Sequence, residues 1–149
     1  MTRFSSLRPI VVVLAAAGLL APPTRASADE RPHFSRGTAQ FVSPTDFVGT
    51  GYATHLGQYT EVGVITFGDF TGPTTMAITA WSTYTAANGD QLDALFSGEL
   101  NVESGVITAT VTYVGGSGRF DGASGSATLT GQLLPGGTIA VSVVGIIDY

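Results

Sequence analysis

Residues 115–125 read Gly-Gly-Ser-Gly-Arg-Phe-Asp-Gly-Ala-Ser-Gly and lie between two runs rich in β-forming residues. Five glycines in this stretch predict a tight, irregular turn, because glycine tolerates positive φ and lets backbones approach closely. Phe120 is the only large apolar side chain of the stretch, so we expect it to fold back and plug one end of a barrel. Arg119 and Asp121 either pair with neighbouring groups of the turn, or Arg119 holds an anion at the barrel mouth. The residues expected to shape this turn are Gly116, Gly118, Arg119, Phe120 and Gly125.

On both sides of the turn, the chain consists of short segments that alternate with the period of two that is typical of strands. Asn88-Gly89, between two such segments, is a strong hairpin signal. The strand candidates are residues 37–42, 47–56, 58–67, 74–86, 90–98, 106–114, 126–134 and 138–147. The sequence therefore predicts an all-β fold, a single closed antiparallel barrel of about eight strands. A two-sheet sandwich is the alternative. An eight-stranded barrel is filled by its own side chains or holds one small ligand.

The N-terminal segment has the three parts of a secretory signal peptide. Arg3 and Arg8 form a basic region, an apolar run follows, and residues 26–28 read Ala-Ser-Ala, a small-residue cleavage site. We therefore expect residues 1–28 to be removed after Ala28 and the protein to be secreted or extracytoplasmic. Residues 29–36 are expected to be a flexible lead, and residues 37–149 to form the barrel domain, with no membrane span left after signal removal.

The charge of the chain after the signal limits its partners. Three basic residues stand against eleven acidic ones, a net charge of −8, and there is no lysine. Such a surface repels phosphate backbones, so no nucleic-acid partner is expected. Cysteine is absent, which excludes disulfides and thiolate chemistry. His33, in the expected lead, and His55 are the only histidines, so we expect no metal site and no cofactor.

Glu61 is the candidate catalytic residue, together with Tyr59, because both share a predicted strand face with Ile65. If this face lines the lumen, burial raises the pKa of Glu61 and makes it a usable general acid or base. If the face points outward, Glu61 is a solvated charge that discourages aggregation. His55 is interpreted either as a turn residue bonded to backbone or as a catalytic base.

Aromatic side chains are the candidate ligand contacts, because rings with a polar tip suit flat, largely apolar molecules. The alternative for each of them is ordinary packing in the core or barrel wall. The candidates are Tyr52, Phe67, Trp81, Tyr84 and Tyr113.

Three segments carry a resemblance to a known family: residues 53–57 (Ala-Thr-His-Leu-Gly), residues 87–90 (Ala-Asn-Gly-Asp), and residues 115–131 with their Gly-Arg-Phe core. The chain resembles exported bacterial members of the allene oxide cyclase-like barrel superfamily, which includes the plant dirigent proteins. The resemblance implies an eight-stranded antiparallel barrel with a central apolar cavity. It also implies binding of reactive hydrophobic molecules, or their cyclisation, largely by shape. No catalytic residue of that family maps onto this chain.

Three functions are left open by these observations. The first is a secreted barrel that binds a small hydrophobic molecule in its lumen. The second is a cofactor-free cyclase or isomerase of the allene oxide cyclase-like or dirigent-like type, acting on a reactive hydrophobic substrate. The third is a structural secreted barrel with a filled core. A homo-oligomer is compatible with each. The room inside the barrel distinguishes the third from the other two.

Overall fold

The structure is a computed structural model that describes residues 29–149; the predicted signal peptide and its cleavage site after Ala28 lie outside these residues. Almost all of the described chain is strand, with one short 3-10 turn, η1. No helix in this part of the chain has the length and hydropathy that crossing a membrane requires. The elements are β1 (Arg31–Phe41), β2 (Asp46–Ala53), β3 (Gly57–Phe70), β4 (Thr75–Ala86), β5 (Gln91–Asn101), β6 (Val106–Gly116), η1 (Gly118–Phe120), β7 (Ser124–Leu133) and β8 (Thr138–Asp148).

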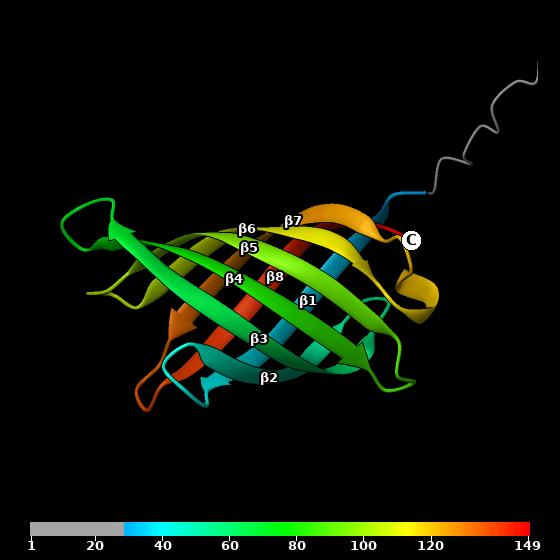
Figure 1. Cartoon of the computed structure of the whole chain (residues 1–149), viewed down its shortest axis with the longest axis horizontal. Coiled ribbons are helices and arrows are strands. Elements are labelled where there is room, and N and C mark those ends of the chain that lie inside the picture. The colour runs from blue at the N-terminus through cyan, green and yellow to red at the C-terminus, as the bar shows by residue number, and fades with distance from the viewer. Residues whose placement is uncertain (1–28) are drawn as a thin grey trace, which may run out of the picture.

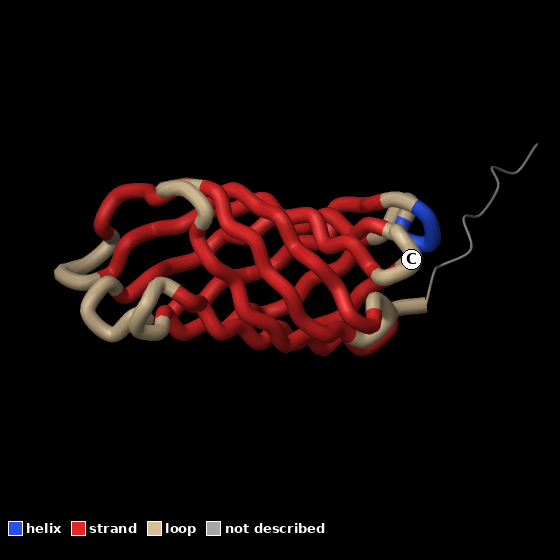
Figure 2. The backbone as a smooth tube through the Cα atoms, turned by 90° about the horizontal axis from the view of Figure 1, so that it is seen from below, coloured by secondary structure: helices blue, strands red, loops and turns tan. Residues whose placement is uncertain are grey.

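The eight strands form one closed barrel in which each strand pairs with its neighbours along the chain (Figures 1 and 2). All pairings are antiparallel, and β1 closes the barrel by pairing with β8 from Arg31–Ile147 to Gln40–Thr138. Within the part of the chain that the structure describes, closure leaves no exposed strand edge for another chain to pair with. The all-β closed barrel of eight strands predicted from the sequence is confirmed, and the sandwich alternative is wrong.

The alternation of each strand separates an inner from an outer face. On β6, Ile107, Ala109, Val111 and Tyr113 are buried, while the threonines between them face outward. The inner faces of β1, β2 and β3 also carry glycines, which give room to the large side chains of neighbouring strands. An ideal Cβ on Gly51 would lie within 2.6 Å of the Tyr59 ring, closer than any real contact. The glycines on the inner face of β2 therefore leave the space that the Tyr59 ring occupies.

One expectation about the N-terminus is wrong. Residues 29–36 were expected to be a flexible lead, but β1 begins at Arg31 and its register with β8 includes His33 opposite Gly145. The physical reason is barrel closure: β8 continues to Asp148 and offers hydrogen-bond partners to the backbone of these residues. The inward side chains here are His33 and Ser35, so the apolar alternation that marks a strand is missing.

The two ends of the barrel differ. At one end η1 and its flanking turns form a cap, in which Phe120 is fully buried and its ring centroid lies 5.0 Å from that of Tyr149. Arg119 forms an ion pair with Asp90 at 3.2 Å. Gly118 has a φ of +63° and lies against the Asp90 side chain, where a Cβ would collide. The other end, hereafter the open end, carries the hairpins at residues 42–45, 71–74, 102–105 and 134–137 (Figure 1).

Candidate functional site

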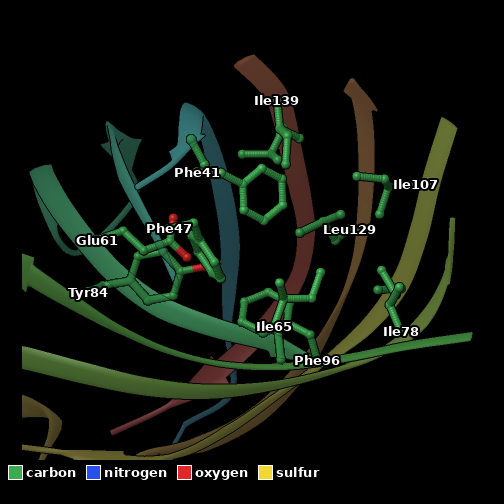
Figure 3. A pocket seen from close by; sticks show the side chains of 14 residues that line it. Phe41, Phe47, Glu61, Ile65, Ile78, Tyr84, Phe96, Ile107, Leu129 and Ile139 are labelled. Atoms are coloured by element: carbon green, nitrogen blue, oxygen red, sulfur yellow. The ribbon is translucent and has the colours of Figure 1, made fainter. Parts of the chain in front are cut away.

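A cavity lies inside the barrel towards the open end (Figure 3). Its volume, measured as the space open to the centres of water molecules, is about 70 Å³. A single water needs roughly 10–15 Å³ by the same measure, so the cavity has room for a compact small molecule. Its walls are aliphatic and aromatic apart from one acid and one tyrosine. The lining residues are Ala39, Phe41, Phe47, Glu61, Ile65, Ile78, Ala80, Tyr84, Phe96, Ile107, Ala109, Leu129, Ile139 and Val141.

Phe41 and Phe47 lie at the entrance to this cavity. They are paired across the β1–β2 ladder next to the hairpin at residues 42–45. Phe41 is partly exposed, and the ring of Phe47 occupies the space that Gly63 leaves free, since a Cβ at Gly63 would overlap it. Two aromatic rings on one hairpin therefore lie between the cavity and solvent.

Among residues 29–149, Glu61 is the only charged residue that lines the cavity, and it is 6% exposed. The Ser82 hydroxyl donates a hydrogen bond to its carboxyl group. Gly49 lies opposite Glu61 on β2, and a Cβ at that position would come within 2.9 Å of Glu61 Oε2. Burial raises the pKa of Glu61, and the hydroxyls of Ser82 and Tyr84 counteract this only in part. The outward alternative for Glu61 is therefore wrong: the acid points into the lumen.

Tyr84 lies directly across from Glu61 in the β3–β4 register, and the oxygens of the two side chains lie close together (Figure 3). Burial, followed by the nearby Glu61 carboxylate, raises the pKa of Tyr84 well above its ordinary value, so the phenol stays protonated. The protonated phenol can donate a hydrogen bond to a molecule in the cavity; the carboxyl group can accept one when ionised and donate one when protonated. This pair is the polar end of the site.

Tyr59 lies behind this pair and does not line the cavity. Its hydroxyl shares a hydrogen bond of 3.0 Å with Ser35, and its ring packs edge-on against Tyr84 with centroids 5.1 Å apart. Burial raises its pKa as well. In this position Tyr59 supports Tyr84, whereas the sequence placed it beside Glu61 as a catalytic partner.

Three of the other aromatic candidates lie elsewhere. Tyr52 is 64% exposed and Trp81 45% exposed, both on the outer wall, so the expectation that they line the lumen is wrong. Their strands place the neighbouring residues inward, Ala53 on β2 and Ser82 on β4. Phe67 is 41% exposed, beside Phe41 with ring centroids 6.4 Å apart, and it does not line the cavity.

Tyr113 is buried but belongs to the capped half of the barrel, where its ring lies 5.2 Å from that of His33. His33 is also buried, and its Nδ1 atom has no hydrogen-bond partner among residues 29–149. Burial, with a smaller contribution from nearby His55, lowers the pKa of His33 to about 4, so the ring is neutral near pH 7. The pair forms a second polar layer between the cavity and the cap.

His55 is a turn residue. It has a φ of +73°, and its Nε2 atom lies 3.0 Å from the carbonyl oxygen of Pro32. Within residues 29–149, no three His, Cys, Asp or Glu side chains come together as a group that could hold a metal ion. The polar groups that the described residues bring together at the cavity are therefore the carboxyl group of Glu61 and the hydroxyl group of Tyr84.

Sequence reasoning did not single out Ser82 and Ser35 as functional residues. Both are buried and hydrogen-bonded to candidate residues. The signal that could have found Ser82 was its position in the alternation of β4. Ser82 lies on the same strand face as Ile78, Ala80 and Tyr84, so if that apolar face points into the barrel, the Ser82 hydroxyl points inward as well. Comparisons of the chain with protein-family models, with curated proteins and with solved structures each gave no match.

Proposed function

We propose that the barrel binds a small, largely apolar molecule in the cavity at its open end, and that Glu61 and Tyr84 hold the molecule's polar group. The observation that carries this proposal is a carboxyl group 6% exposed in an otherwise aliphatic and aromatic cavity. Burying an acid without a cationic partner costs stability, so an acid in this setting is more often functional than structural. A purely structural barrel would have no need of it.

Binding is tested by placing a larger side chain in the cavity wall. Ala109 lines the cavity, and Ala109→Leu fills part of it; Thr108→Leu adds a similar side chain to the outer wall of the same strand and is the matched control. Mass spectrometry of the gently extracted protein identifies any co-purified molecule. We expect a bound apolar compound with the unaltered protein and with Thr108→Leu, and its loss with Ala109→Leu. Equal amounts with both variants contradict binding in this cavity.

A cofactor-free cyclase or isomerase is the second candidate, and the burial of the Glu61 carboxyl group in the cavity wall favours it. A carboxyl group with a raised pKa that faces an apolar cavity has the properties of a general acid or base. This reading follows the resemblance of residues 53–57, 87–90 and 115–131 to allene oxide cyclase-like and dirigent-like barrels. With a reactive hydrophobic substrate, Glu61→Gln is expected to abolish turnover and to leave binding within a fewfold. Unchanged turnover would eliminate this role.

We also propose that the protein acts outside the cytoplasm, after removal of residues 1–28. The support is the basic, apolar and Ala-Ser-Ala pattern of that segment. N-terminal sequencing of the protein from its native host tests this: a mature chain that begins at Asp29 is expected, and one that begins at Met1 contradicts it.

A further inference from the structure

The rim of the open end is acidic. Asp46 begins β2 beside the hairpin at residues 42–45, and Asp69 lies near the end of β3. Glu99 lies near the end of β5, and Glu103 follows in the turn to β6. All four side chains are exposed, so each contributes negative potential at the end where the cavity lies.

Positive charge is kept away from that end. The described residues contain three arginines: Arg31 and Arg119 lie at the capped end, and Arg36 faces outward from the middle of β1. Arg119 is paired with Asp90, and Arg31 lies over the Tyr149 ring at 4.6 Å. None of them lines the cavity. Acids lie at both ends of the barrel, with Asp90, Asp121 and Asp148 among those at the capped end, but the described arginines lie only at the capped end and on the outer wall. The rim of the open end is therefore acidic without a basic side chain to offset it.

The carboxyl group of Glu61 therefore has hydroxyl neighbours but no cationic one. Ser82, Tyr84 and Tyr59 are the polar side chains that lie around it, and Glu61 Oε2 packs closely against Gly49, where a Cβ would come within 2.9 Å of it. A buried carboxylate is costly when it is unpaired and much less costly when a cation meets it in good geometry. The protein supplies every part of such a pair except the cation.

We propose that the molecule bound in the cavity is a small hydrophobic amine, whose ammonium group pairs with Glu61 while its hydrocarbon part packs against the aliphatic wall. This inference rests on the proposed function and makes it specific for a class of ligand. The acidic rim attracts the cation, because a cleft lined by one sign of charge raises the local concentration of the opposite ion. The same rim repels carboxylic acids of equal size.

The test compares four molecules of similar shape: benzylamine, benzyl alcohol, toluene and benzoate. Binding is followed by NMR on protein labelled at the isoleucine methyl groups, since Ile65, Ile78, Ile107 and Ile139 all line the cavity. We expect benzylamine at neutral pH to bind about tenfold or more tightly than benzyl alcohol or toluene, the usual size of a charge-assisted hydrogen bond. Benzoate is expected to leave the methyl signals unchanged.

Glu61→Gln keeps the shape of the side chain and removes its charge. It is expected to lower benzylamine affinity about tenfold, to that of benzyl alcohol, and to leave toluene binding unchanged. If toluene and benzyl alcohol bind as tightly as benzylamine to the unaltered protein, the amine inference is overturned while the proposed function stands. If none of the four molecules shifts the isoleucine signals, the cavity is not a binding site and both proposals fail. The comparison among ligands needs no variant, so it holds even if Glu61→Gln does not fold.

The rim is tested separately with Asp69→Asn combined with Glu103→Gln. For neither side chain does the structure show a hydrogen bond or an ion pair, so the change affects charge alone. We expect a loss of benzylamine affinity of about twofold at low salt that disappears at high salt, where surface charges are screened. Asp121→Asn, at the capped end, is the matched control and is expected to change nothing. Equal affinities for the rim variant and the control at low salt would remove the rim from the inference.

Discussion

The Ser82 hydroxyl on β4 donates a hydrogen bond to the Glu61 carboxyl group on β3, and both side chains point into the barrel. Each of the two strands thereby presents a polar residue to the interior at the edge of an apolar cavity. A hydrophobic pair at these positions would pack without the cost of burying polar groups. The pair has a chemical consequence: burial raises the pKa of Glu61, and the Ser82 hydroxyl counteracts this by stabilising the charged form of the acid.

Glu61 should make the stability of the barrel depend on pH. Its pKa is raised in the folded state, so its contribution is fully present below the ordinary value of 4.5 and is lost as pH rises through the folded pKa. The loss is about 1.4 kcal/mol for every pH unit between the two pKa values. Glu61→Gln removes this term. We expect the free energy of unfolding, measured by urea denaturation at a series of pH values, to rise for the variant relative to the unaltered protein above pH 4.5. The same pH dependence of the free energy of unfolding in both proteins would contradict the burial of this acid.

His33 should have the opposite effect on the pH dependence of stability. Its pKa is lowered to about 4 in the folded state, so its contribution is fully present above the ordinary value of 6.5 and is lost as pH falls towards about 4. The unfolded chain takes up a proton in this range and the barrel does not. We expect His33→Gln to be less sensitive to acid than the unaltered protein between these two values. Thermal unfolding in matched buffers measures the difference, and an NMR titration showing an ordinary His33 pKa would refute it.

Phe120 should contribute strongly to stability, because it is fully buried in the cap. Removal of a buried phenylalanine ring costs about 3–5 kcal/mol, from lost burial and from the cavity that is left. Phe120→Ala is therefore expected to lower the free energy of unfolding by that amount. Phe34→Ala is the control, since Phe34 is exposed on the outer wall, and its effect should stay below about 1 kcal/mol. Similar losses for the two variants would show that the cap does not depend on this ring.

Gly51 should tolerate no side chain. A Cβ there would overlap the Tyr59 ring, whose position is fixed by Ser35 and Tyr84. Gly51→Ala is expected to cost about 1–3 kcal/mol, as overpacking of a filled interior does. Thr50→Ala, on the outer face of the same strand, should cost less than about 1 kcal/mol. A Cβ at Gly51 would also collide with the carbonyl oxygen of Arg36 on β1. Chemical denaturation compares the two variants, and a neutral Gly51→Ala would mean that both Tyr59 and the backbone at Arg36 can move aside.

The strands were predictable from the sequence because their alternation and turn residues are local signals. Val106 to Val114 and the Asn88-Gly89 hairpin lie where the pattern placed them, and Tyr59, Glu61 and Ile65 do share a face. Which face points inward was not predictable. On β4 the polar Ser82 points inward and the apolar Trp81 points outward, the reverse of the usual preference. The hydrophobicity of the side chains therefore did not indicate which face of the strand lines the interior.

The site itself depends on contacts between strands far apart in the sequence. The cavity is lined by residues from all eight strands, and its size follows from how their side chains pack. The strand that contains His33 was missed for the same reason, because its formation depends on a long-range contact. This strand is formed by pairing with residues more than a hundred positions later, which no local pattern reveals.

The pairing of β1 with β8 brings the two described ends of the chain to the capped end, with Arg31 opposite Ile147. Figure 1 shows the last strand and the start of β1 at the same end of the barrel. A short linker from residue 149 to residue 31, with new termini at residues 134–137, would give a circular permutant that keeps every strand pairing. Fusion partners or surface tethers attached next to residues 31 and 149 would stand at the end of the barrel away from the cavity, which leaves the open end free in experiments on immobilised protein.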